Sequence, residues 1–370
     1  MRLGVIDVGS NTVHLLVVDA HPGASPVPYH SERSTLRLMR FLDDDGAIVE
    51  EGQRLLIEAI GGAAATVAEI GVDDVISTAT SAIREAANGE EVLARIARET
   101  GVELQVLSGD DEARITMLAV RRWFGWSAGE ILLFDIGGGS FEIAQGADEY
   151  PDAQVSLPLG AARATARFLR GDPPKRDAVS ALRAHARAAF TEARDTLFAD
   201  RPKPTRVVGT SKTIRSLGRL VGGPADPVTG APAPIYYTGL REWEPTLREM
   251  PSDVRQYLPG ITPERGPQIL AGAILLRTAM KVFDVPTLIV SPWALREGIV
   301  LRYIDALDAP ERAGGSAASS SSVSPAASGT NSPPCDSTTC LMRPFAIALP
   351  ASEFTRSCVG KASRGFTASR

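Results

Sequence analysis

Two short stretches of this chain place an aspartate, glycines and hydroxyl residues in the same order. The first is Asp7-Val8-Gly9-Ser10-Asn11-Thr12, and the second is Asp135-Ile136-Gly137-Gly138-Gly139-Ser140. Each lies between two apolar runs, which predicts a β-hairpin with a tight, glycine-bearing turn. Backbone N–H groups of such a turn can approach an anion closely because glycine has no Cβ. An aspartate at the strand end supplies hard oxygen for Mg²⁺. Two copies roughly 130 residues apart indicate a duplicated fold whose halves face one phosphate group.

The composition narrows the class of protein. The chain has 370 residues, 44% of them apolar and 22% charged, with a formal net charge of −5. We therefore expect no nucleic-acid partner, because no global basic field is present. No apolar run reaches about 18 residues, so we expect no membrane partner. The three cysteines, Cys335, Cys340 and Cys358, lack metal-site spacing and leave the body without a disulfide framework. A cytoplasmic location is the simplest interpretation.

Strand and helix patterns alternate along the first 300 or so residues, which predicts an α/β protein. Apolar residues recur at helical spacing from Glu50 to Gly71, and alternation from Ser34 to Phe41 predicts a strand. Ser108 followed by Asp111 predicts a capped helix that runs through Trp123. Beyond residue 309 the chain becomes rich in Ser, Ala and Gly, so 310–370 is predicted to be a disordered low-complexity tail.

Six motifs in order resemble one known family. They are the two hairpin motifs, the second extended to Glu142, together with Thr80-Ser81-Ala82-x-Arg84-Glu85-Ala86-x-Asn88, Ser108-Gly109-x-x-Glu112-Ala113-Arg114, Ser156-Leu157-Pro158-Leu159-Gly160 and Ala294-Leu295-Arg296-Glu297-Gly298. Over residues 1 to about 305 the chain resembles the exopolyphosphatase and guanosine pentaphosphate phosphohydrolase (Ppx/GppA) family in its short two-domain form.

The resemblance implies an α/β fold of two actin-like domains. That superfamily is ribonuclease H-like and includes sugar kinases and heat-shock ATPases. Domain I would cover 1–122, with a helix at 294–308 packing back on it, and domain II would cover 123–293. The active site would lie in the cleft between them. A homodimer is expected from the family alone.

Cleaving a terminal phosphoanhydride requires a held phosphoryl group, neutralised charge and an aligned water. The resemblance makes Glu112 the catalytic glutamate that activates this water and Glu142 a second carboxylate near it. Asp7 and Asp135 would hold Mg²⁺, with Mn²⁺ as the alternative metal. The predicted phosphate-binding residues are Gly9, Ser10, Asn11, Thr12, Arg84, Gly137, Gly138, Gly139, Ser140 and Lys212.

Several of these residues also have plainer explanations. Glu112 falls in the first turn of a helix, where acids are common because of the helix dipole. Glu142 can face solvent from an alternating strand, and Arg84 can pair with Glu85 or Glu90 on the surface. By the same reasoning Asn88 is predicted to be a helix cap, His14 to be structural, and Arg121 and Arg122 to be a solvated helix end.

Lys212 bears on the choice of substrate. It stands in Gly209-Thr210-Ser211-Lys212-Thr213, where actin-like kinases usually have a glycine pair that admits adenosine. A long cation there favours phosphate over a nucleoside, and Arg215 and Arg219 continue the same helical face. A basic surface stripe is the competing explanation. The P-loop pattern is absent, which excludes a P-loop NTPase.

We therefore expect an exopolyphosphatase that releases orthophosphate from inorganic polyphosphate in a metal-dependent reaction. Three alternatives stay open. One is a guanosine pentaphosphate 5′-phosphohydrolase of the stringent response, which acts on the same kind of bond. Another is a non-catalytic sensor that binds guanosine tetraphosphate. The third, an ATP-dependent kinase or chaperone, would need the glycine-rich adenosine motif that this chain lacks.

Overall fold

The computed structural model describes residues 1–21, 23, 26–223 and 232–308. The predicted tail, 310–370, lies outside the described residues. Within the described part, no helix combines the length and apolarity that a membrane span needs.

The first sheet has the strand order β3-β2-β1-β4-β5. Its strands are β1 (Arg2–Val8), β2 (Thr12–Asp19), β3 (Pro28–Thr35), β4 (Asp74–Ala79) and β5 (Gln105–Val106). The hairpin of β1 and β2 and its neighbour β3 pair antiparallel, whereas β4 and β5 join parallel to β1. The first predicted hairpin is thus present, with one added antiparallel strand and parallel strands on its other side.

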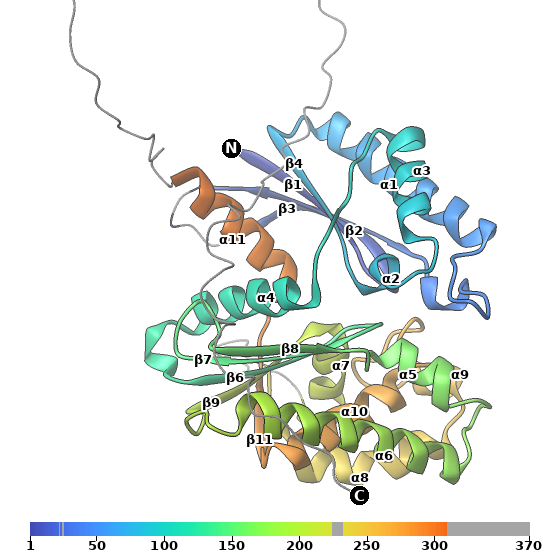
Figure 1. Ribbon diagram of the computed structural model, residues 1–370, viewed down its shortest axis with the longest axis vertical. Coiled ribbons are helices and arrows are strands. Elements are labelled where there is room, and N and C mark those ends of the chain that lie inside the picture. The colour runs from blue at the N-terminus through green and yellow to red at the C-terminus, as the bar shows by residue number, and fades with distance from the viewer. Residues whose placement is uncertain (22, 24–25, 224–231, 309–370) are drawn as a thin grey trace, which may run out of the picture. The chain divides into compact units, whose positions relative to one another are not determined.

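The second sheet repeats this plan. Its strands are β6 (Ile131–Ile136), β7 (Phe141–Gly146), β8 (Ala153–Leu157), β9 (Arg206–Thr210), β10 (Ile235–Tyr236) and β11 (Thr287–Val290), in the order β10-β11-β9-β6-β7-β8. The hairpin of β6 and β7 again carries an antiparallel strand, β8, on one side and parallel strands, β9 and β11, on the other. Both mixed sheets therefore share one five-strand topology, as the duplicated hairpin motif predicts, and the second sheet adds β10 at its edge, antiparallel to β11 (Figure 1).

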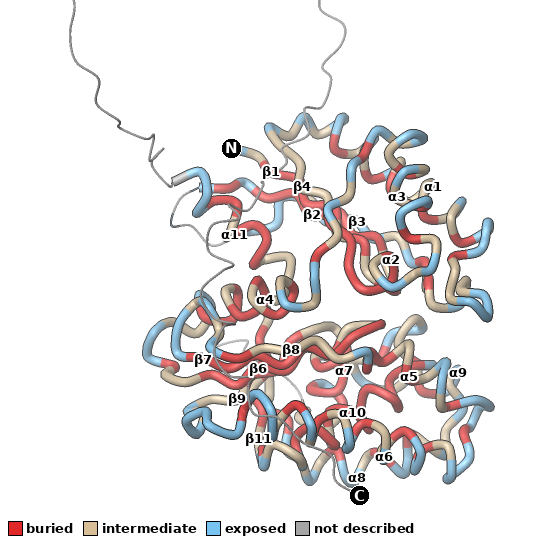
Figure 2. The backbone as a smooth tube through the Cα atoms, in the orientation of Figure 1, coloured by how far each residue is buried: buried red, intermediate tan, exposed pale blue. Residues whose placement is uncertain are grey.

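Helices cover both faces of each sheet (Figure 1). They are α1 (Glu50–Ile70), α2 (Ser81–Arg84), α3 (Gly89–Thr100), α4 (Gly109–Phe124), α5 (Ala161–Phe168), α6 (Arg176–Ala193), α7 (Ser211–Val221), α8 (Tyr237–Glu249), α9 (Ser252–Arg255), α10 (Ile269–Val282) and α11 (Leu295–Asp308). Residues of the two central hairpins, β1–β2 and β6–β7, are largely buried, whereas the edge strand β3 is mostly exposed and the outer helices alternate buried and exposed positions (Figure 2). This is the pattern of amphipathic helices packed on a sheet.

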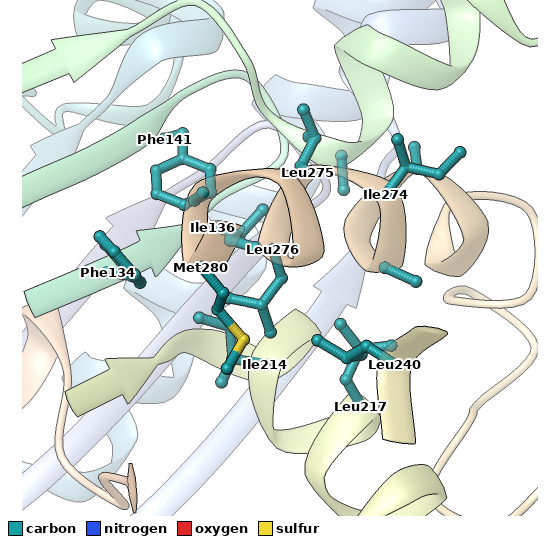
Figure 3. Close-up of a cluster of buried hydrophobic side chains, with 14 of the residues drawn as sticks. Phe134, Ile136, Phe141, Ile214, Leu217, Leu240, Ile274, Leu275, Leu276 and Met280 are labelled. Atoms are coloured by element: carbon teal, nitrogen blue, oxygen red, sulfur yellow. The ribbon is translucent and has the colours of Figure 1, made fainter. Parts of the chain in front are cut away.

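The largest core lies under α10 on one face of the second sheet. Phe134 and Phe141 from the sheet, Ile214 from α7 and Leu276 from α10 belong to it (Figure 3). Every residue of α10 from Ile269 to Leu276 is buried, so this part of the helix is surrounded by protein.

Helices α4 and α11 pack against each other and cover the remaining sheet faces. Ile299 and Tyr303 of α11 join a core with Leu3 and Val5 of β1, while Met117 of α4 joins a core with strands of the second sheet. Helix α11 thus packs on the first sheet. The boundary at 122/123 stays a prediction, and it falls within α4, which contacts the second sheet as well as α11.

Two local predictions were wrong, and a third was confirmed only in part. The strand expected at Ser34–Phe41 lies earlier, at β3, because pairing with β2 fixes its register. Asn88 is the N-cap residue of α3, as predicted, but its side chain does not cap the helix. Its amide instead exchanges two hydrogen bonds with the backbone of Ile48, at 2.8 and 3.0 Å. Arg121 is only 1% exposed and donates to the carbonyls of Gly125, Gly129 and Gly146. Its side chain is therefore buried and hydrogen-bonded to the backbone, and is not solvated at the helix end as predicted.

Candidate functional site

Each hairpin places its aspartate in the same position. Asp7 pairs with His14 across β1 and β2, and Asp135 pairs with Glu142 across β6 and β7. Because side chains alternate along a strand, Asp7 shares the face of Leu3 and Val5, which packs on α11. Asp135 likewise shares the face of Ile131 and Leu133, which packs on α4. Both aspartates therefore point from their sheets toward the layer that α4 and α11 form.

Glu112 reaches the same place from the first turn of α4. The Ser108 hydroxyl accepts a hydrogen bond from the N–H of Asp111 at 3.0 Å, which confirms the predicted cap. Glu112 is 7% exposed and forms an ion pair with Arg84. The Arg84 Nη1 atom also donates to the carbonyl of Leu107 at 2.6 Å, and its Nη2 atom lies 3.7 Å from the Glu85 carboxylate. Arg84 is therefore held beside Glu112 and also pairs with Glu85, as its plainer explanation proposed.

Four carboxylates, Asp7, Glu112, Asp135 and Glu142, perturb one another and are called the carboxylate cluster here. Burial raises the pKa of Glu112 to about 7, with the Arg84 guanidinium opposing this and the charges of Asp135 and Asp7 adding to it. Burial raises the pKa of Asp135 to about 6, opposed by Arg215. Burial, Glu112 and Asp135 hold the pKa of Glu142 well above its ordinary value. The two sheets thus contribute acids to one buried group.

The two glycine turns, 9–12 and 137–140, are in contact beside this cluster. A Cβ on Gly138 would lie 2.7 Å from Asn11 Nδ2, and one on Gly139 would press against Ser81 Oγ. The Ser81 hydroxyl is also 3.2 Å from Ser10 Oγ. Both positions favour glycine, because an added Cβ would collide with the side chains that line the turns.

The orientation of the second turn is set by α5. The N–H groups of residues 160–163 donate to the carbonyls of Gly137, Gly138 and Gly139 at 3.0 Å. No described group accepts a hydrogen bond from the N–H of Gly138 or Gly139. With the carbonyls tied to α5, these N–H groups are available to an anion.

Lys212 lies among arginines from several elements, and we call Lys212, Arg33, Arg215, Arg265 and Arg296 the cation cluster. Burial, and then the charges of these four arginines, lower the pKa of Lys212 to about 6. Arg215 donates to the carbonyl of Pro292 at 2.9 Å, and Arg265 to Thr213 Oγ1 at 3.1 Å. Arg296 and Lys212 also lower the pKa of Asp7, against the larger opposite effect of burial. The cation cluster thus adjoins the carboxylate cluster.

Further contacts join the two sheets around the site. Arg163 of α5 forms an ion pair with Glu85 at 2.5 Å and donates to the carbonyl of Gly139 at 2.8 Å. The Asn11 amide donates to the Gln268 side chain at 3.3 Å. A cavity of about 460 Å³ opens beside Arg84 and Glu85, and its walls include Ser108 and Gly109 from one side and Ser156 and Pro158 from the other. This cavity gives a ligand access to the neighbourhood of Glu112.

Sequence reasoning missed several residues of the site. Arg33, Arg265 and Arg296 received no role, and neither did the pair of Glu85 and Arg163. Arg296, Glu85 and Gly160 lay inside motifs that carried the resemblance, so a signal existed for them. Arg33 lies on the edge strand and Arg265 just before α10, and nothing in their local sequence marks them.

The residues present fit Mg²⁺. The Asp7 Oδ1 atom is buried without a hydrogen-bond partner, and the pKa values of all four clustered carboxyl groups are raised. Among the described residues, no set of three or more Asp, Glu, His or Cys side chains forms a ready-made metal cage. Mg²⁺ usually takes one or two carboxylates together with waters and substrate phosphates. Asp7 and Asp135 suit that mode of binding.

Comparison with known proteins identifies the fold and the family. Two sheets that share one strand topology around a common site define an actin-like α/β protein. A solved Ppx/GppA family member from Aquifex aeolicus is 27% identical to this chain and superposes with a TM-score of 0.69. The match covers 83% of this chain and 99% of the Aquifex aeolicus chain. A solved exopolyphosphatase from Cytophaga hutchinsonii, 23% identical over 83% of this chain and 98% of its own, has a TM-score of 0.73 and bears on the fold alone.

Sequence relatives are closer. The protein named Exopolyphosphatase 1 in Mycobacterium leprae is 47% identical over 306 residues, which is 82% of this chain and 90% of the relative. The protein of the same name in Mycobacterium tuberculosis is 47% identical over 308 residues, 82% of this chain and 89% of the relative. The model of the Ppx/GppA phosphatase family matches residues 16–307. The chain belongs to the Ppx/GppA phosphatase family, and the predicted actin-like fold is confirmed.

Proposed function

We propose that this protein is an exopolyphosphatase, which hydrolyses the terminal phosphoanhydride of inorganic polyphosphate and releases orthophosphate. The observation that carries the proposal is the carboxylate cluster, placed beside two touching glycine turns and next to the cation cluster. The names of relatives that are 47% identical support the same substrate.

Each group has a defined task in this reaction. The N–H groups of Gly138 and Gly139, together with the hydroxyl groups of Ser10 and Ser140, bind oxygens of the terminal phosphoryl group. Glu112 accepts a proton from the attacking water, and a pKa of about 7 suits a base that works near neutral pH. Arg84 keeps Glu112 in place and has further N–H groups for a phosphate oxygen. Asp7 and Asp135 are the residues that would hold Mg²⁺, which spreads the charge of the phosphoryl oxygens when bound.

The cation cluster supports polyphosphate over a guanosine substrate. A phosphate chain carries charge along its whole length, and the four arginines of the cation cluster, with Lys212 once a polyanion has raised its pKa, can follow it. Lys212 occupies the place where related kinases admit a nucleoside. Guanosine pentaphosphate ends in the same anhydride, so it is the alternative substrate that the experiment must separate.

The test is orthophosphate release by the purified full-length protein. Long polyphosphate, short polyphosphate, guanosine pentaphosphate and ATP are compared with Mg²⁺, with Mn²⁺ and with chelator. The Glu112→Gln variant removes the base, and Glu103→Gln, an exposed acid without an ion pair among the described residues, is its matched control.

We expect metal-dependent release from polyphosphate that falls about 10²- to 10⁴-fold in Glu112→Gln and is unchanged in Glu103→Gln. Release chiefly from guanosine pentaphosphate would assign the alternative substrate. No release from any substrate, together with tight binding of guanosine tetraphosphate, would mean a sensor and refute the proposal. Light scattering on the same sample tests the homodimer that the family suggests.

A further inference from the structure

A second cationic cavity lies between α6 and α10 and shares no residue with the carboxylate or cation clusters. Its volume is about 260 Å³. Arg183, Arg187 and Arg194 approach it from α6 and the π-helical turn that follows, and Arg277 and Lys281 approach it from α10. Residues 183 and 187, and residues 277 and 281, are four apart, so each pair lies on one side of its helix. Two packed helices thus direct five cations into one space.

A buried carboxylate holds two of these arginines in place. Glu244 of α8 is 5% exposed and lies between the two helices. It forms an ion pair with Arg183, and its Oε2 atom is 2.9 Å from Arg277 Nε. A guanidinium has five N–H donors, and this contact uses only part of them. Glu244 therefore orients both guanidinium groups and leaves further donors free for a ligand.

The three other basic residues of the cavity, Arg187, Arg194 and Lys281, differ in whether they form an ion pair. Arg194 pairs with Asp195 at 2.7 Å and donates to the carbonyl of Val282 at 3.0 Å. Arg187 and Lys281 form no ion pair with any described residue, and both are exposed. Positive charge is therefore in excess around the cavity, although the chain as a whole has a net charge of −5.

Exposed basic residues on helices are most often simply solvated. Two observations distinguish this cavity from such a face. The side chains converge on one open cavity from α6, the turn that follows it and α10, and a buried acid fixes two of them instead of leaving them mobile. Planar guanidinium groups in fixed positions match the oxygens of phosphate groups, which they bind with two parallel hydrogen bonds.

We propose that the α6/α10 cavity is a binding site for a diphosphate group, either as inorganic pyrophosphate or as part of a nucleotide. Its volume is below the roughly 300–1,000 Å³ that is usual for drug-sized ligands, so a compact anion fits it best. The inference is independent of the proposed function, because neither Glu112 nor the glycine turns take part in it.

The test is calorimetric titration of inorganic pyrophosphate into full-length Glu112→Gln protein, a background chosen so that the ligand is not hydrolysed. Arg187→Gln with Lys281→Gln removes two exposed cations of the cavity. Lys175→Gln with Arg176→Gln removes the same charge from the start of α6, about 16 Å away along the helix, and is the matched control. Hydrogen exchange in the presence of pyrophosphate reports which helices the ligand protects.

We expect affinity at the cavity to fall about tenfold or more in Arg187→Gln/Lys281→Gln and to stay unchanged in the control, because each charge-assisted hydrogen bond is worth about a factor of ten. Protection on α6 and α10 should disappear with it. Equal affinity for ADP would assign recognition to the diphosphate alone, and tighter binding of ADP would assign a nucleotide.

Two results would overturn the proposal. One is pyrophosphate binding of equal affinity and stoichiometry in the cavity variant and the control. The other is equal protection of α6 and α10 by sulfate at the same concentration, which would reduce the cavity to a general counter-ion site.

Discussion

Gly160 offers a sharp test of how the second glycine turn is held. It precedes α5 with φ −67° and ψ 154°, a conformation open to any residue, so alanine introduces no backbone strain. The added Cβ would, however, fall on the carbonyl group of Gly138 and on the carbonyl carbon of Gly139. These are backbone atoms, so the turn itself must move to make room.

The expected size of the effect follows from these contacts. Forcing one methyl group into a packed site costs about 1–3 kcal/mol. The shift also strains hydrogen bonds from residues 160–163 to the turn, each worth about 1 kcal/mol. We expect Gly160→Ala to lower the free energy of unfolding by about 2–4 kcal/mol. Misplacing a binding group by about 1 Å costs on the order of a hundredfold in rate, which is the loss of polyphosphatase activity we expect.

The assays are urea unfolding and orthophosphate release at saturating polyphosphate. Gly62→Ala is the matched control, since Gly62 lies inside α1 with no atom within 4 Å of the added Cβ. There the same substitution should raise the free energy of unfolding by about 0.5–1 kcal/mol and leave activity unchanged. A Gly160→Ala protein as stable and as active as the wild type would refute the idea that close contact with α5 positions the turn.

Three further predictions concern charge and hydrogen bonding. Lys212 has a pKa of about 6, so it is largely neutral at pH 8, and a polyanion beside it raises this pKa. Polyphosphate binding should therefore take up about one proton at Lys212, and Lys212→Met should remove this uptake. Calorimetry in buffers of different ionisation enthalpy measures the uptake. Burial raises the pKa of Glu112 from 4.5 to about 7, so its contribution to stability is complete below pH 4.5 and is lost as the pH rises through 7. The free energy of unfolding of the wild type, measured in urea, should therefore fall by on the order of 3 kcal/mol between pH 4.5 and 8. This fall should be absent in Glu112→Gln. The Tyr303 hydroxyl donates to Asp74 and ties α11 to the first sheet, so Tyr303→Phe should lower the unfolding free energy by about 1 kcal/mol.

Each of these predictions has a control at an exposed position. Lys203→Met should leave proton uptake unchanged, Glu103→Gln should leave the pH dependence of stability unchanged, and Tyr257→Phe, at a tyrosine that is 83% exposed, should leave stability unchanged. Equal proton uptake in the Lys212 variant would show that this lysine is already charged before ligand binds. A parallel pH profile for Glu112→Gln would place the pKa of Glu112 near its ordinary value, and a fully stable Tyr303→Phe protein would make its hydrogen bond irrelevant to α11.

The sequence by itself determined the features that depend on neighbouring residues. Alternation and glycine-bearing turns predicted both hairpins, and the Ser108 cap predicted where α4 begins, because turns and caps are satisfied within a few residues. The repeated motif predicted the shared topology of the two sheets, and the six ordered motifs predicted the family. The roles assigned to Glu112, Asp7 and Asp135 stay predictions that the geometry accommodates.

Other features were decided by the tertiary structure. Asn88 forms its hydrogen bonds with the backbone of Ile48, 40 residues earlier in the chain. The buried Arg121 donates to carbonyl groups that lie beyond the end of its own helix. Such hydrogen-bond partners cannot be predicted from the local sequence. The residues around a long polar side chain do not show whether water or a distant backbone group forms its hydrogen bonds.

The candidate site also combines features that the local sequence predicts with features that only the folded structure brings together. Alternation along β1 and β6 predicts which way Asp7 and Asp135 point within their own sheets. Only the packing of α4 and α11 brings Glu112 to both of them, and only the assembled fold gathers Arg33, Arg265 and Arg296 around Lys212. The raised carboxyl pKa values and the lowered pKa of Lys212 follow from that burial and proximity, since both depend on distances in space that residue order alone does not set.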